Sequence, residues 1–321
     1  QDEVPVYAEF RRSVIRYRYG QQETGPYQRP IPHYVDTEYC KKHGIRCNHT
    51  KPSLNLKKLT SVKRTLNIIQ KKLPNVIKVW YYFYMKYENI VRGKFKERPN
   101  RFIASVCVEG NEERAHVKNT GRCRELLEKD ADIYLEDHIG KMGKRKLRYS
   151  LIAVEKKTER GTFLVNMDSQ APNKVVKEAI ENGDIRLPGM SSLVKIKAEA
   201  MYGESRLDFY AEDDRGREAY IEVKGVTLEE DGLARFPDAP TERGVRHLEE
   251  LIKAAGEGKK AFVIFVIQMK GVNAFTPNDR THKAFADALR KASSEGVNVM
   301  AYDCIVTRSS IVCADSVPVI L

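Results

Sequence analysis

The sequence predicts a mixed α+β and α/β fold, in which a small β-barrel of the OB-fold type precedes a larger α/β domain. Two observations carry this prediction. Short strand-like segments separated by polar turns recur between residues 85 and 168, and helical and strand-like segments alternate between residues 169 and 321. With 321 residues, of which 41% are hydrophobic, the chain is long enough to fill two cores.

The barrel is predicted from candidate strands in residues 85–168. Five or six short strands within about eighty residues are typical of small barrels. The candidates are Tyr87–Lys94, Arg101–Glu109, Arg114–Lys118, Asp132–Glu136, Tyr149–Lys156 and Thr162–Asn166. The basic run Lys144, Arg145 and Lys146 precedes one of them and is a candidate phosphate contact, with a solvated turn as the alternative.

The second domain, residues 169–321, begins with a helix over Pro172–Asn182 that Gly183 ends. Thr241 is the expected N-cap of a second helix. The apolar run 261–268 predicts a buried central strand. The remaining expected elements are strands over 194–201, 206–211, 219–226 and 297–306, and helices over 242–255 and 281–294.

Residues 1–84 lack sustained periodicity and hold 16 Lys and Arg against 6 Asp and Glu, a net charge of +10. Residues 85–168 have a net charge of +5 and residues 169–321 of −3. We predict that 1–84 is an extra basic segment of no assignable role and a candidate for poor order, either an appendage or a mis-extended reading frame. Cys40, His43, Cys47 and His49 cluster there, but their spacing favours incidental clustering over a zinc site.

A hairpin over residues 205–225 carries the strongest candidate for chemistry. Strand alternation places Asp208, Glu222 and Lys224 on one face. A turn centred on Arg215 puts Asp208 opposite Glu222, although a register shift by two residues stays open. The other face comprises Leu207, Phe209, Ile221 and Val223.

Two carboxylates opposite each other on adjacent strands repel, and a divalent cation relieves the repulsion. We expect Mg²⁺ or Mn²⁺, because hard ions take oxygen ligands and keep waters and phosphate oxygens. Asp208, Glu222 and Lys224 are the candidate catalytic residues, with Lys224 holding a water or stabilising phosphate charge. Asp208, Glu222 and the helix residue Glu178 are the candidate metal ligands. An ordinary solvent-facing hairpin is the alternative.

A second signal lies at the start of the helix over residues 242–255. Arg243 and His247 are four residues apart and share one helix face, where they are candidate phosphate contacts. A solvated helix face explains them as well. Gln268, at the end of the apolar strand, is a further candidate to line the site.

Several short blocks of the sequence resemble, in the same order, those of a known protein family. They are Lys86-Tyr-Glu-Asn, Arg101-Phe-Ile-Ala, His116-Val-Lys-Asn-Thr-Gly, Lys144-Arg-Lys-Leu, Pro172-Asn, Ser205-Arg-Leu-Asp-Phe, Tyr220-Ile-Glu-Val-Lys-Gly-Val-Thr-Leu, Phe236-Pro-Asp-Ala-Pro-Thr-Glu-Arg-Gly and His247-Leu. On these blocks the chain resembles the sugar fermentation stimulation (SfsA) family over about residues 85–311. Residues 1–84 have no counterpart in this resemblance.

The resemblance implies an OB-fold followed by a PD-(D/E)xK nuclease-like domain. It also implies DNA binding and a regulatory link to sugar metabolism, particularly that of maltose. Asp208, Glu222 and Lys224 fall on the nuclease-type motif, and Glu178 is its helix carboxylate. Asn119, Thr120 and Arg122 lie in the family's turn after the early barrel strands and are expected to meet the nucleic acid.

Three functions follow from these expectations. The first is DNA binding with low sequence preference, and the second is an active Mg²⁺- or Mn²⁺-dependent nuclease. The third is a scaffold whose acidic site is a relic. The scattered cysteines and the acidic N-terminal residues predict a cytoplasmic location, with no membrane association and no obligate protein partner.

Overall fold

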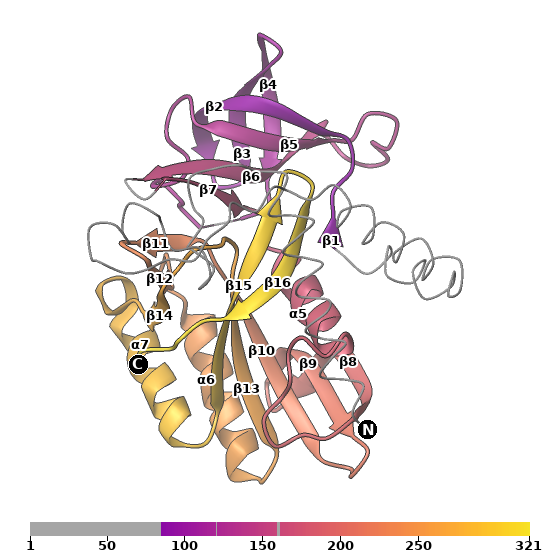
Figure 1. The fold of residues 1–321 in the computed structure, drawn as a ribbon, viewed down its shortest axis with the longest axis vertical. Coiled ribbons are helices and arrows are strands. Elements are labelled where there is room, and N and C mark those ends of the chain that lie inside the picture. The colour runs from indigo at the N-terminus through magenta and orange to yellow at the C-terminus, as the bar shows by residue number, and fades with distance from the viewer. Residues whose placement is uncertain (1–84, 120, 159–160) are drawn as a thin grey trace, which may run out of the picture. The chain divides into compact units, whose positions relative to one another are not determined.

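The computed structural model describes residues 85–119, 121–158 and 161–321. The predicted basic segment 1–84 and its cysteine and histidine cluster lie outside the described residues, as does Thr120, a predicted nucleic-acid contact. The two predicted domains are coloured from indigo to magenta and from rose to yellow in Figure 1.

The first domain is a small β-barrel, as the sequence predicts. Its strands lie in the order β4-β3-β2-β5-β6-β7, and a parallel pairing of β4 with β6 closes five of them in the OB topology. In β2, a Cβ on Gly93 would lie 2.9 Å from the Cys107 carbonyl oxygen, so glycine permits the close approach of β3. The bounds are β2 (Ile90–Asn100), β3 (Ile103–Val108), β4 (Asn111–Val117), β5 (Asp132–Asp137), β6 (Tyr149–Thr158) and β7 (Gly161–Asn166).

The second domain is built on a seven-stranded sheet in the order β1-β16-β15-β13-β10-β9-β8. Strands β10, β13 and β15 are parallel, and the other neighbours are antiparallel. β1 precedes the barrel in the chain but pairs with β16, so this sheet takes in residues that the sequence assigns to the barrel. The bounds are β1 (Met85–Lys86), β8 (Leu193–Tyr202), β9 (Ser205–Asp213), β10 (Glu218–Val226), β13 (Lys260–Ile267), β15 (Asn298–Thr307) and β16 (Ser310–Ser316).

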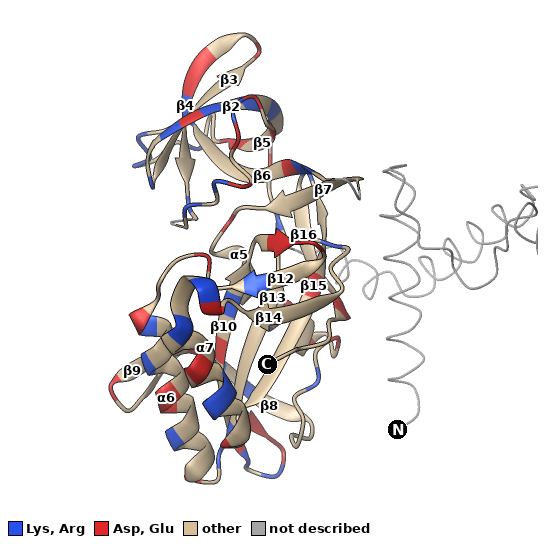
Figure 2. Ribbon diagram, turned by 90° about the vertical axis from the view of Figure 1, so that its left-hand side faces the viewer, with Lys and Arg blue, Asp and Glu red and all other residues tan. Residues whose placement is uncertain are grey.

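Helices cover both faces of the large sheet (Figure 1). Helix α5 (Ala171–Glu181) packs on one face, and α6 (Glu242–Gly256) and α7 (Asp279–Ser294) pack on the other. β13 contributes to both cores, because Val263 and Phe265 face α6 and α7 whereas Phe262, Ile264 and Val266 face α5. Acidic and basic residues alternate on the outer surface of α6 and α7 (Figure 2).

Some elements of the second domain were not predicted. β11 (Leu228–Glu230), β12 (Leu233–Phe236) and β14 (Ala274–Pro277) form a separate three-stranded sheet, and β16 lies beyond the last predicted strand. The predicted cap of α6 is confirmed, since Thr241 Oγ1 accepts a hydrogen bond from the Gly244 amide at 3.1 Å. Within the described ranges, no helix is both long and apolar enough to cross a membrane.

Candidate metal centre

The β9–β10 hairpin has the register that the sequence predicts. Tyr210 pairs with Tyr220 and Phe209 with Ile221, so a continued ladder would place Asp208 opposite Glu222. The ladder ends at the Phe209–Ile221 pair. Beyond this pair, the Asp208 side chain replaces the backbone pairing by a hydrogen bond from the Val223 amide.

Asp213 holds the turn of this hairpin. Its carboxylate accepts hydrogen bonds from the amides of Ser191, Arg215 and Arg217 and from Arg217 Nε, at 2.7–3.0 Å. Burial alone would raise the pKa of Asp213, but the hydrogen bonds, beginning with that of Ser191, outweigh burial and hold the pKa well below its usual value. The turn is therefore fastened by an ionised carboxylate.

Asp208 joins the two strands to helix α5. Its Oδ2 accepts a hydrogen bond from the Val223 amide at 2.8 Å, and its Oδ1 accepts one from Asn173 Nδ2 at 2.8 Å. Leu207 packs with the core of α6, whereas Phe209 packs with that of α5. The prediction that Leu207 and Phe209 share one face is thus wrong; the pairing of β9 with β10 ends at Phe209, before Leu207 is reached.

Glu222 lies buried beside Asp208, with 3% of its surface exposed. Its Oε1 is 2.5 Å from Lys224 Nζ and 2.5 Å from His247 Nδ1. Its Oε2 is buried and has no hydrogen-bond partner among the described residues. A buried anionic oxygen without a partner is costly, so this atom is the feature of the site that calls for a cation.

Arg243 and His247 stand behind Glu222 on α6. His247 Nε2 accepts a hydrogen bond from Arg243 Nε at 3.2 Å, which leaves the proton on Nδ1 for Glu222. Both ring nitrogens of His247 are used within the protein, and the residue is 4% exposed. His247 therefore has no atom for the nucleic-acid contact that the sequence predicts and instead orients Glu222, whereas Arg243 remains exposed.

The two carboxylates differ in their electrostatic environments. Burial, followed by the negative charge of Glu222, raises the pKa of Asp208 above its usual value. Burial would also raise the pKa of Glu222, but the hydrogen bond from His247 and the charge of Lys224 outweigh it, and the pKa is lowered. The environment thus favours the ionised form of Glu222 over that of Asp208, and a bound cation would favour the ionised form of both.

The chemistry of this centre fits a hard divalent cation held partly by waters or phosphate oxygens. Among the described residues, no group of three or more His, Cys, Asp or Glu side chains is placed to hold a metal ion. The predicted ligand set of Asp208, Glu222 and Glu178 is therefore not assembled. Glu178 Oε2 accepts a hydrogen bond from the Met85 amide of β1 at 3.1 Å. The spacing of apolar residues predicts the buried face of α5, but it does not predict which strand lies beside Glu178.

Asn173 and Gly225 are residues of this centre that the sequence reasoning missed. Asn173 follows Pro172 at the start of α5, and this Pro-Asn pair is among the sequence blocks that could have pointed to Asn173. A Cβ on Gly225 would lie 2.5 Å from Gln268 Oε1 and 2.8 Å from Pro172 Cγ. Glycine thus lets the end of β10 pass between Gln268 and α5. We refer to Asp208, Glu222 and Lys224, with Asn173 and His247 behind them, as the carboxylate centre.

The other predicted nucleic-acid residues lie on the barrel. Asn119 Oδ1 accepts a hydrogen bond from the Gly121 amide at 2.8 Å and shapes a turn, and Arg122 beside it is exposed. Lys144, Arg145 and Lys146 are exposed in the loop between β5 and β6, with Arg145 bonded to the Ser150 hydroxyl. None of these basic residues is hydrogen-bonded or ion-paired to Asp208 or Glu222 within the described part of the chain.

The fold and the centre together define a protein with an OB domain and a restriction-endonuclease-like domain. A family profile described as "SfsA N-terminal OB domain" matches residues 97–166, and one described as "Sugar fermentation stimulation protein RE domain" matches residues 170–310. The chain belongs to the sugar fermentation stimulation protein (SfsA) family. The resemblance drawn from the sequence blocks is thereby confirmed.

Relatives from several organisms match the chain across nearly their whole length. The sugar fermentation stimulation protein homologue of Clostridium beijerinckii is 53% identical over 237 residues, which are 74% of this chain and 100% of the relative. That of Desulfitobacterium hafniense is 51% identical over 73% of this chain and 98% of the relative. The solved structure of Pyrococcus furiosus SfsA in complex with Ca²⁺ matches with a TM-score of 0.66 and 30% identity, over 74% of this chain and 99% of that one.

Proposed function

We propose that the protein binds DNA with little sequence preference. The observation that carries this proposal is the set of exposed cations on the barrel that lack acidic partners. Lys144, Lys146 and Arg122 make no ion pair within the described residues, whereas Lys94 on the same barrel is paired with Asp132. Unpaired cations on an OB barrel suit a phosphate backbone, which they bind without reading the bases.

Electrophoretic mobility shift of a random-sequence DNA at two salt concentrations tests this proposal. We expect a complex whose affinity falls steeply as the salt concentration rises, because phosphate contacts release counterions. Two unrelated DNA sequences should bind with similar affinity. Retention that is indifferent to salt would exclude phosphate contact as the basis of binding.

We propose as a second function that the carboxylate centre is a Mg²⁺- or Mn²⁺-dependent phosphodiesterase. The unpartnered Oε2 atom of Glu222 favours this candidate. Asp208 and Glu222 would hold the ion, and Lys224, positioned by Glu222 at 2.5 Å, would stabilise charge on the attacked phosphate. A bound divalent ion supplies charge neutralisation and lowers the pKa of a bound water. The Pyrococcus furiosus relative was solved as a complex with Ca²⁺, which supports a site for hard cations in this family.

Cleavage of assorted DNA and RNA, with and without Mn²⁺, tests the second function. We expect metal-dependent cleavage by the wild type and none by Asp208→Ala. Mn²⁺ should also raise the melting temperature of the wild type but not that of the variant. Equal cleavage by both proteins would remove Asp208 from the mechanism. An absence of both cleavage and metal stabilisation would favour a centre that is a relic.

The name of the relatives connects them with sugar fermentation, and we extend this connection to the chain as part of the proposal. Regulation of sugar metabolism, of maltose in particular, would act through DNA binding. Growth on maltose of a host that lacks its own relative, with and without this chain, tests the connection. A host that grows equally in both cases would argue against a regulatory role.

A further inference from the structure

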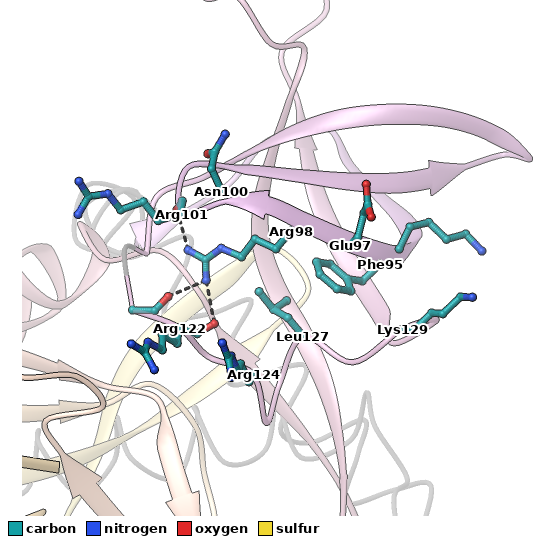
Figure 3. Close-up of a pocket in the computed structure, with 11 residues that line it drawn as sticks. Phe95, Glu97, Arg98, Asn100, Arg101, Arg122, Arg124, Leu127 and Lys129 are labelled. Carbon is teal, nitrogen blue, oxygen red and sulfur yellow. Dashed lines mark hydrogen bonds between the residues drawn. The ribbon is translucent and has the colours of Figure 1, made fainter.

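A cavity of about 430 Å³ opens on the barrel between β2 and residues 121–129 (Figure 3). This volume lies in the usual range for binding sites of small ligands. Six of the eleven residues that line it are basic and only Glu97 is acidic. We call it the cationic cavity, and its basic residues are Lys96, Arg98, Arg101, Arg122, Arg124 and Lys129.

Arg98 organises the rim of the cationic cavity. Its Nη1 donates hydrogen bonds to the carbonyl oxygens of Gly121 at 2.6 Å and Arg122 at 3.0 Å. Its Nη2 donates to those of Asn119 and Arg101, both at 2.6 Å. Figure 3 shows the guanidinium between the backbone of Arg101 and that of Arg122. One arginine thus fastens Asn119, Gly121 and Arg122 to the end of β2.

Arg98 makes no ion pair within the described residues. All four of its acceptors are neutral carbonyl oxygens, and no carboxylate lies within ion-pair distance. Its Nε is buried and has no hydrogen-bond partner in the part of the chain that the structure describes. A partly buried cation in such surroundings is stabilised when an anion approaches, so the cavity favours an anionic ligand.

Arg122 and Arg124 add positive charge that is free to bind. Both side chains are exposed, and neither makes a hydrogen bond or ion pair within the described part of the chain. On the same barrel, Lys96 is paired with Asp130 at 2.7 Å. The tip of the β3–β4 hairpin, by contrast, is acidic (Figure 2). Six cations thus line the cavity, whereas the hairpin tip carries carboxylates.

Gly121 connects the cationic cavity with the side of the molecule that holds the carboxylate centre. Gly121 lines this cavity and also a second one of about 160 Å³, which Gly225 and Asp238 line from the other domain. Gly225 directly follows Lys224 in β10. A Cβ on Gly121 would lie 1.9 Å from Asp238 Oδ2, so any larger residue would have to displace the Asp238 carboxylate. A ligand that follows both cavities must be extended.

We propose that the cationic cavity is a phosphate subsite for a nucleic-acid strand, and that the strand continues past Gly121 to the carboxylate centre. This inference rests on the proposed binding of nucleic acid and adds the place and path of one strand. Arg122 and Arg124 contact phosphoryl oxygens, and Arg98 positions Gly121 and Arg122. The recognised group is the phosphoryl group, whether it belongs to a strand or to a small phosphate ligand.

Fluorescence anisotropy of a labelled single-stranded oligonucleotide in EDTA tests the subsite without cleavage. The variant is Arg122→Gln/Arg124→Gln, and the matched control is Arg114→Gln. Arg114 is an exposed barrel arginine outside the cavity lining. It makes no ion pair with any residue that the structure describes. We expect the double variant to bind about tenfold more weakly. The slope of the logarithm of its binding constant against the logarithm of the salt concentration should be smaller in magnitude by about 1.4, because two phosphate contacts are lost. The control should bind like the wild type.

Each outcome of this experiment decides the inference. If the wild type binds and the double variant matches Arg114→Gln, the subsite is wrong while nucleic-acid binding stands. If the wild type does not bind any oligonucleotide or duplex, the proposed function fails, and the strand path with it. Stabilisation by pyrophosphate of the wild type, but not of the double variant, would then assign the cavity to a small phosphate ligand. Equal melting temperatures of the three proteins without ligand verify that they are folded.

Discussion

At the carboxylate centre, Glu222 is buried and its charge is met at 2.5 Å by Lys224 and His247. At the cationic cavity, Arg98 is surrounded by neutral carbonyl oxygens, and Arg122 stands exposed without a partner among the described residues. The first arrangement fixes one oxygen atom in a defined place and suits a small cation. The second gathers charge over a wide opening and suits a flexible anion. The carboxylate centre is therefore suited to hold a cation in one position, and the cationic cavity is suited to attract an anionic ligand.

The largest expected effect comes from Glu222→Gln, which tests whether the two regions act separately. Loss of this carboxylate should lower metal-dependent cleavage at least about 100-fold, because the variant holds the cation poorly. Oligonucleotide affinity in EDTA should stay the same or rise slightly. Cleavage rates and anisotropy on the same preparations check this. An equal loss of affinity and cleavage would show that the two regions are one site.

A smaller effect is expected when the support behind Glu222 is removed. His247→Leu should weaken Mn²⁺ binding about 10- to 100-fold, because groups that orient a metal ligand contribute on this scale. His247→Gln should recover part of the affinity, since an amide can still donate to Glu222. Calorimetric titration with Mn²⁺ measures both variants. Identical affinities for wild type and His247→Leu would mean that His247 only fills space.

Gly225→Ala asks how tightly the centre is packed. The added Cβ would lie 2.5 Å from Gln268 Oε1 and 2.8 Å from Pro172 Cγ. We expect a loss of about 1–3 kcal/mol in the free energy of unfolding, as for other overpacked positions. Urea unfolding measures it. Gly110→Ala, at a turn where a Cβ meets nothing within 4 Å, separates crowding from the general effect of replacing a glycine, although its positive φ adds strain of its own.

The smallest effect concerns the turn that sets the hairpin register. The folded state lowers the pKa of Asp213, so its ionised form stabilises the protein above the unfolded-state pKa, near pH 4, and this contribution is lost as the pH falls towards the folded-state pKa. Asp213→Asn should therefore melt a few degrees below the wild type at neutral pH, and the difference should shrink at about pH 3. Thermal unfolding at both pH values checks this. A difference that is constant with pH would deny a role for the charge.

Much of the hairpin could be predicted from the sequence, because alternation and a short turn fix the register of β9 and β10. The position of Glu178 could not, because helical periodicity defines a face but not which strand lies opposite each turn. Arg98 gave no signal at all. Its acceptors come from four residues, three of which are more than twenty positions away, and only the folded barrel brings them together.

The short sheet β11-β12-β14 was missed for a different reason. Its strands have three or four residues, which is too few for a period of two to stand out. Its place in the fold depends on pairing between β12 and β14, which are separated by about forty residues. Such contacts are set by the tertiary structure rather than by local propensity.

Strand β1 reaches back from the start of the barrel to pair with β16, and its Met85 amide holds Glu178 of α5. The endonuclease-like domain is therefore discontinuous in the chain, with its edge supplied from before the barrel. A fragment that begins at residue 169 would leave β16 as an open sheet edge, a template for self-association. Dissection of this protein into two autonomous halves would thus require residues 85–86 to be grafted back onto the second half.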